Sequence, residues 1–253
     1  MVTTYLRAIF SSAESMGTVK YSHKAILRMM EAVNSREKII IYGKGNREGI
    51  CSIAMLILML RYFNADFDYF LIPKGGNKES LVADVKTHLN FYCPDVLVSL
   101  EDSFTESVYE TLREEGKDLI AIGHQGEEVP YGFQEVEKSL LKTVFHFAKG
   151  LSDNYDTRNV YRYTDLVYLG IDAEEAHQDD LLDMGLDRLR VSTNYGIRAL
   201  KKMSNEEDTQ LRTLVSPKDN PWSMVDNARI IIELLTTEDT HRAEQIAKYL
   251  VNS

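Results

Sequence analysis

The sequence predicts an α/β fold in which a doubly wound parallel sheet is followed by a mainly helical half. In the first half, short apolar runs without alternation recur between helix-like patterns, which is typical of parallel strands that are covered on both faces. After about Phe133 only helix-like patterns follow. Because no Gly-, Ser- or Pro-rich linker separates the halves, we expect one unit made of a core (1–133) and a helical part (134–253).

The first half alternates helices and strands at the spacing of βαβ units, which implies right-handed crossovers. The first helix is amphipathic, and the second is apolar nearly all round and therefore buried. Pro73 closes the second strand, and Gly116 ends the last helix of this half. The expected helices are Ser22–Asn34, Gly49–Phe63, Ser80–Leu89 and Thr105–Glu115. The expected strands are Lys38–Tyr42, Phe67–Ile72, Val96–Leu100 and Asp118–Ile122.

The second half is expected to contain only helices. Their ranges are Val136–Gly150, Asn159–Asp172, Asp179–Arg190, Tyr195–Met203, Asn227–Leu235 and Asp239–Val251. Asp239 has the residue type and position of an N-cap for the last of them.

Composition places the chain among ordinary globular proteins, with 44% apolar and 27% charged residues. The longest apolar run, Ile50–Leu60, is shorter than the roughly 20 residues that a membrane span requires. No secretory signal is visible at the N-terminus, and the two cysteines lack metal-type spacing. These features predict a cytoplasmic protein.

The net charge of −10 is unevenly distributed, and an acidic chain is poorly suited to tight duplex binding. From 165 to 187 there are eight acids and no Lys or Arg. This stretch would suit a basic protein partner, although it could equally be a solvated helix face. The residues that would form the partner surface are Asp165, Asp172, Glu175, Asp179, Asp180 and Asp183.

Ligands of open parallel sheets bind beyond the carboxyl ends of the strands, so the turn Gly43–Gly49 is the first place to look for a site. It lacks the GxxxxGK pattern of a P-loop, and its glycines give GxGxxxG, one residue longer than the dinucleotide fingerprint. Backbone N–H groups at the helix start could still bind an anion. Such an anion-binding turn would use Gly43, Lys44, Gly45 and Gly49.

The same turn resembles the first motif of the RecJ-like DHH phosphoesterases, in which D-x-D-x-D stands between two glycines. The three aspartate positions fall on Lys44, Asn46 and Glu48. Further motifs follow in order: VLVSLEDSF places Glu101 in an aspartate position, and YLGIDAEEA does the same for Glu174. The Asp-His-His triplet that names the family falls on Gly123, His124 and Gln125.

The resemblance covers nearly the whole chain and implies a DHH domain without the family's second, substrate-gripping domain. In active members these aspartates and the histidine hold two divalent metals that activate water. Here Lys44 puts a positive charge in a metal position, Gly123 removes a ligand, and Asn46 lacks a charge. Three glutamates displace their carboxylates by one methylene. We therefore expect no catalysis and no metal or other cofactor. The glutamates would pair with Lys44 and Arg47, or else hold a single weakened metal.

A RecJ-like chain with altered metal motifs resembles the non-catalytic branch of the family that serves in the CMG replicative helicase, which has archaeal members. That resemblance implies a scaffold that binds the GINS complex and, through it, the MCM ring, with weak contact to single-stranded DNA and a nucleoid location in a prokaryote. Two alternatives remain open. One is a weakened Mn- or Mg-dependent phosphoesterase or single-strand exonuclease. The other is an anion- or nucleotide-binding regulator that uses the Gly43–Gly49 turn.

Overall fold

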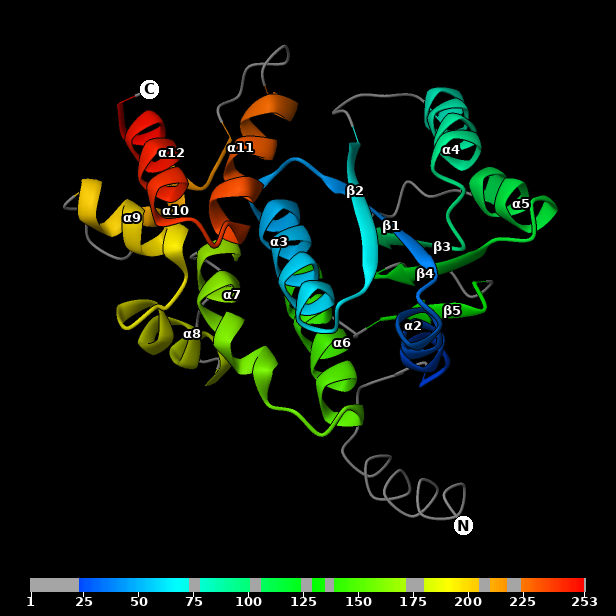
Figure 1. Ribbon diagram of the computed structural model, residues 1–253, viewed down its shortest axis with the longest axis horizontal. Helices are drawn as coiled ribbons and strands as arrows, with labels where there is room; N and C mark the ends of the chain where they lie inside the picture. Colours follow the sequence, from blue (N-terminus) through cyan, green and yellow to red (C-terminus); the bar gives the residue numbers. More distant parts are fainter. Residues whose placement is uncertain are drawn as a thin grey trace.

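The computed structural model describes residues 23–72, 78–100, 106–123, 129–134, 139–171, 180–204, 210–217 and 224–252. In this part of the chain, five parallel strands form one sheet in the order β2-β1-β3-β4-β5. The strands are β1 (Lys38–Lys44), β2 (Asp66–Ile72), β3 (Val96–Leu100), β4 (Asp118–Ile122) and β5 (Tyr131–Phe133). Figure 1 shows the sheet between helices on both faces.

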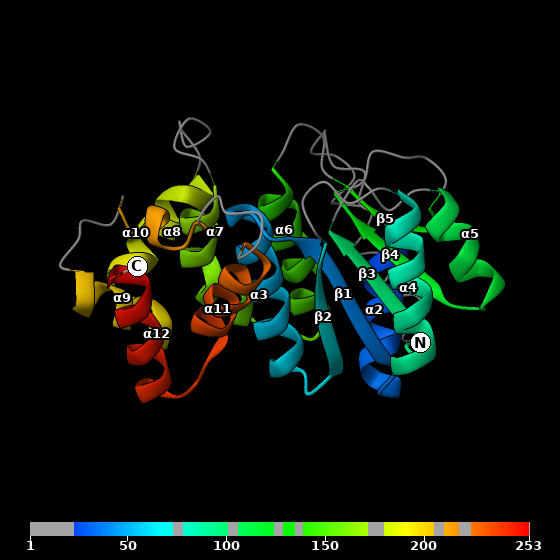
Figure 2. The same cartoon turned by 90° about the horizontal axis from the view of Figure 1, so that it is seen from above.

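The two faces of the sheet bury separate apolar clusters, as the alternation of side chains along a strand requires. Ile39 and Ile41 of β1 belong to the larger cluster, whereas Ile40 and Tyr42 belong to the smaller one. The helices over the larger cluster are α2 (His23–Ser35), α3 (Arg47–Tyr62) and α6 (Leu140–Asn154). The helices over the smaller cluster are α4 (Lys78–Tyr92) and α5 (Glu106–Glu114). Figure 2 shows α4 and α5 on the side of the sheet away from α3 and α6. The sheet is therefore doubly wound.

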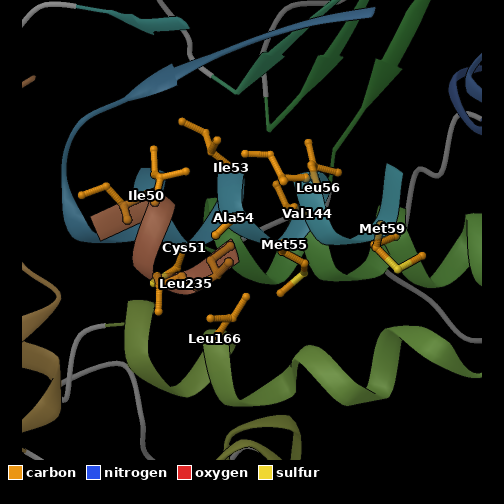
Figure 3. Packing of buried hydrophobic residues seen from close by; sticks show 14 of the residues in the cluster. Ile50, Cys51, Ile53, Ala54, Met55, Leu56, Met59, Val144, Leu166 and Leu235 are labelled. Carbon is orange, nitrogen blue, oxygen red and sulfur yellow. The ribbon is translucent and has the colours of Figure 1, made fainter. Parts of the chain in front are cut away.

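Besides α6, the second half contains the 3₁₀ helix η1 (Asn159–Tyr163), α7 (Thr164–Gly170), α8 (Asp180–Arg190), α9 (Tyr195–Ser204), α10 (Leu211–Leu214), α11 (Met224–Thr236) and α12 (Thr240–Asn252). Of these, α7 and α11 pack against α3, α8 packs against α7, and α9 and α12 pack against α11 and each other. Figure 3 shows α3 with its apolar side chains pointing to every side, and with Leu166 of α7 and Leu235 of α11 beside it. The larger cluster thus contains residues from both halves. None of the helices in the described ranges is long and apolar enough to cross a membrane.

The structure confirms the predicted α/β class and the order of the four expected strands, and it adds elements that the sequence did not predict. β5 has only three residues, and α10 has four, so neither is long enough to show the periodicity of apolar residues from which strands and helices are predicted. The expected helix Asn159–Asp172 begins as the 3₁₀ helix η1 and becomes α-helical at Thr164. Asp239 is a cap as predicted, because its Oδ1 accepts the N–H groups of His241 (2.8 Å) and Arg242 (3.1 Å).

Candidate functional site

The candidate site lies where β1, β3 and β4 end. The connection from β1 runs through α3 to β2 on one side, and that from β3 runs through α5 to β4 on the other. The chain therefore reverses its direction of winding between β1 and β3, which is the place where open α/β sheets form their crevice. The register puts Gly43 of β1 beside Leu100 of β3.

The turn after β1 is short and closely packed. Only Gly45 and Asn46 separate Lys44, the last residue of β1, from Arg47, the first of α3. A Cβ atom on Gly49 would lie 2.3 Å from the carbonyl oxygen of Lys44, so a larger residue would force the strand end and the helix apart. Lys44 itself is exposed.

Asn46 is the N-cap of α3. Its Oδ1 accepts the backbone N–H of Gly49 at 3.0 Å, and its carbonyl accepts that of Ile50 at 2.8 Å. Asn is among the residues most favoured at this position. The oxygen that would have to bind a metal thus accepts a hydrogen bond within α3, and the N–H of Gly49 in the proposed anion-binding turn is already bound.

Glu48 reaches across to α6. Its Oε1 accepts the backbone N–H of Leu141 at 3.1 Å, in the first turn of that helix. Ser139, the N-cap of α6, accepts the next N–H, that of Lys142, at 3.3 Å. Glu48 therefore satisfies a helix N–H that would otherwise need water or another partner.

Arg47 reaches in a different direction, to the end of α7. Its Nε donates to the carbonyl oxygen of Gly170 and its Nη1 to Oγ of Ser216, both at 3.4 Å. Arg47 thus binds a carbonyl and a hydroxyl, and Oε1 of Glu48 binds a backbone N–H. The expected pairing of the glutamates with Lys44 and Arg47 stays a prediction, because Glu101 and Glu174 lie outside the described residues.

The chain leaves β4 through Gly123, which has a φ of +80°. This left-handed conformation favours glycine over residues with a side chain. The N–H of Gly123 donates to the carbonyl of Phe133 at 2.8 Å, and a Cβ atom there would lie 2.8 Å from Cδ1 of Leu140. Gly123 and Glu48 therefore meet adjacent residues in the first turn of α6.

The structure describes only part of the predicted site. Lys44 ends β1, Asn46 and Glu48 are the N-cap and the first turn of α3, and Gly123 follows β4. Four further positions lie outside the described residues: Glu101, His124, Gln125 and Glu174. In the part of the chain that the structure describes, no three His, Cys, Asp or Glu side chains are grouped as metal ligands. Cys51, one turn into α3, is fully buried, which raises the pKa of its thiol to about 12 and keeps it protonated.

Asp165 does not belong to a partner surface, contrary to the sequence-based expectation. It is only 1% exposed. Its carboxylate accepts Oγ–H of Ser192 at 2.6 Å and the N–H of Leu166 at 2.9 Å, and burial raises its pKa above the usual range. All residues of α7 are buried, which agrees with the apolar residues that follow Asp165 in the sequence. Asp180 and Asp183 are exposed on α8, and the other three acids of that set lie outside the described residues.

Arg212 is a residue of this region that the sequence did not reveal. It is 7% exposed, its Nε donates to the carbonyl oxygen of Tyr168 at 2.9 Å, and its guanidinium carbon lies 4.1 Å from the centre of the Tyr168 ring. Arg212 and Arg47 thus both bind carbonyls in the last turn of α7. Because these contacts join residues far apart in the sequence, no local sequence pattern predicts them.

Comparisons with known proteins agree on the fold. No protein-family model matches the chain. The single-stranded-DNA-specific exonuclease RecJ of Bacillus subtilis (strain 168) is 24% identical over 266 aligned positions, which cover 90% of this chain and 32% of that protein. The chain therefore spans about a third of the length of this relative.

Two solved structures align with almost all of the chain. RecJ from Thermus thermophilus in complex with Mn²⁺ has a TM-score of 0.76 at 20% identity, covering 94% of this chain and 38% of that one. An exonuclease RecJ bound to manganese has a TM-score of 0.75 at 20% identity, covering 94% of this chain and 66% of that one. The chain has the RecJ-like DHH fold.

Proposed function

We propose that this chain is a non-catalytic RecJ-like subunit of the DNA replication machinery that bridges the GINS complex and the MCM helicase and supports DNA unwinding. In this role it would resemble archaeal cell division control protein forty-five. We assign the positions Lys44, Asn46, Glu48, Glu101, Gly123, His124, Gln125 and Glu174 to a metal site that has lost its function.

The observation that carries this proposal is the hydrogen bond between Glu48 and the start of α6. In a two-metal site a carboxylate at this position would be turned toward the metals, which need oxygen ligands at about 2.0–2.2 Å. Here its Oε1 accepts the N–H of Leu141. The neighbouring positions support the same conclusion, because the side-chain oxygen of Asn46 caps α3 and Gly123 has no side chain to act as a ligand.

The relatives give a specific alternative, because RecJ of Bacillus subtilis is described as a single-stranded-DNA-specific exonuclease and two RecJ structures contain manganese. A weakened exonuclease is therefore the second candidate. It would require a carboxylate oxygen of Glu48 to bind a metal, either Oε2 beside the present contact or Oε1 after it leaves Leu141.

A nuclease assay separates the two candidates. The purified chain is incubated with 5′-labelled single-stranded DNA and Mn²⁺, with Glu48→Ala as the matched variant. We expect both proteins to release no more label than buffer does. Mn²⁺-dependent release by the wild type that is lost in Glu48→Ala would contradict the proposal.

A pull-down tests the scaffold role itself. The tagged chain is recovered from lysate of the native organism at moderate salt, and bound proteins are identified by mass spectrometry. We expect GINS subunits in stoichiometric amount, with MCM in lower amount. Recovery of the chain alone would contradict the proposed partnership even if no nuclease activity were found.

A further inference from the structure

Two neighbouring residues of opposite charge hold the ends of two different helices. Glu48 accepts the N–H of Leu141 at the start of α6, and Arg47 donates to the carbonyl of Gly170 at the end of α7. Both residues belong to the first turn of α3. A single dipeptide therefore connects the strand-end turn to two helices of the second half of the chain.

Each charge is matched to the helix end that it contacts. The start of a helix carries partial positive charge from unpaired N–H groups, and its end carries partial negative charge from unpaired carbonyls. The acidic Glu48 is at the start of α6, and the basic Arg47 is at the end of α7. Reversing the two residues would set both charges against a helix end of the same sign.

A small polar network extends the contact of Arg47. Ser216 accepts from Nη1 of Arg47 at 3.4 Å and donates from its Oγ to the carbonyl of Arg212 at 2.8 Å. Arg212 in turn binds the carbonyl of Tyr168. Two carbonyls in the last turn of α7, which cannot bond within a helix that stops there, thus have arginine donors.

The close packing of the three helices fixes the positions of these charges. A Cβ atom on Gly170 would lie 2.3 Å from Cδ2 of Leu141 in α6 and 2.8 Å from Cβ of Cys51 in α3. The end of α7, the start of α6 and the first turns of α3 therefore meet at one point. A glycine there allows the backbone of α7 to approach closely enough for Arg47 to reach it.

We propose that Arg47 and Glu48 form a charge-matched clasp that fastens the second half of the chain to the sheet at the strand ends without a metal ion. The clasp sits at the positions where the resemblance to the DHH phosphoesterases places a metal motif. It rests on the contacts of the two residues and does not depend on the proposed role in replication.

The test compares Arg47→Ala, Glu48→Ala and the exchange Arg47→Glu/Glu48→Arg in the full chain by thermal unfolding. Each alanine variant is expected to lower Tm by about 2–4 °C, because a charge at a helix end contributes modestly to stability. The exchange is expected to lower Tm by more than the sum of the two. Arg198→Ala and Glu110→Ala, at exposed positions of α9 and α5, are the matched controls and should leave Tm unchanged.

Hydrogen exchange shows where each variant loosens the fold. Glu48→Ala should speed exchange in the first turn of α6, and Arg47→Ala should speed it in the last turn of α7. Glu48→Gln keeps an acceptor oxygen and should restore part of the protection. The clasp would be overturned if the exchange variant were no less stable than the alanine variants, or if Mn²⁺ raised Tm in the wild type and Glu48→Ala abolished that rise.

Discussion

At the scale of single residues, the turn after β1 carries out structural tasks that its residue types suit. Asn46 caps α3, Glu48 binds the first turn of α6, and Gly49 lets the helix start against the strand end. In our proposal Asn46 and Glu48 occupy the positions of a former metal motif, and these contacts are the reason for assigning them a structural role.

Gly49→Ala is expected to destabilise the fold. The added Cβ would lie 2.3 Å from the carbonyl oxygen of Lys44, and backbone cannot move aside as a flexible side chain can. We expect a loss of about 1–3 kcal/mol in the free energy of unfolding, measured by urea denaturation. Gly132→Ala is the control, since its nearest contact would be at an ordinary 3.5 Å. Equal stability of the two variants would show that the turn is not tightly packed.

The buried carboxyl of Asp165 should make stability depend on pH. Burial raises the pKa of this group above its usual range, so the folded state keeps the proton to a higher pH than the unfolded chain does. Between the two pKa values the folded state binds more protons, and the free energy of unfolding therefore falls as pH rises through this window.

Because asparagine cannot titrate, Asp165→Asn should remove this fall of the free energy of unfolding with rising pH. Urea denaturation at a series of pH values measures it. Asp180→Asn, at an exposed position of α8, should keep it. Asp165→Ala should in addition cost about 1–3 kcal/mol, because the hydroxyl of Ser192 and the N–H of Leu166 lose their acceptor. A pH profile of Asp165→Asn that matched the wild type would contradict this assignment.

At the scale of secondary-structure elements, the sequence predicted those strands and helices that a local residue pattern specifies. The bounds of β3 and β4 are as expected, because continuous apolar runs between turn signals specify strands that are buried on both faces. The three-residue β5 pairs with the edge of β4, and it is too short for its sequence to show a strand period. The contact between Glu48 and Leu141 joins residues 93 apart, so no local pattern in the sequence could predict it.

The layer of α4 on the sheet contains a polar contact that gives a prediction of its own. The hydroxyl of Tyr42 in β1 lies 2.8 Å from Nδ1 of His88 in α4, and the His88 ring stacks on Phe70 of β2 with 3.7 Å between the ring centres. Burial lowers the pKa of His88 below its ordinary value of 6.5, opposed in part by Asp84, and burial also raises the pKa of Tyr42. The neutral ring is therefore expected to accept the proton of the phenol.

Tyr42→Phe should raise the pKa of His88 and lower the free energy of unfolding by about 1 kcal/mol, because it removes a donor that favours the neutral ring. In the wild type, His88 binds a proton more readily in the unfolded chain than in the folded one. The contribution of His88 to the free energy of unfolding therefore grows as pH rises toward 6.5 and is lost on acidification. An NMR titration of the ring protons measures the pKa. An unchanged pKa in Tyr42→Phe would contradict the hydrogen bond.

At the scale of the whole molecule, the sheet and the helical half share one large apolar cluster around α3, and the candidate site lies where they meet at the strand ends. The fold is that of RecJ-like proteins, two of which have been solved with manganese. Our proposal of a non-catalytic role rests on the strand ends, where Oδ1 of Asn46 and Oε1 of Glu48 accept backbone N–H groups of α3 and α6.

The most direct test of this account is the binding of Mn²⁺ to the metal-stripped wild-type chain, measured by isothermal titration calorimetry with Glu48→Ala as the comparison. We predict no saturable heat in the micromolar range for either protein. Saturable binding of one or two Mn²⁺ ions that disappears in Glu48→Ala would show that this carboxylate binds a metal. That result would contradict both the metal-free clasp and the non-catalytic role.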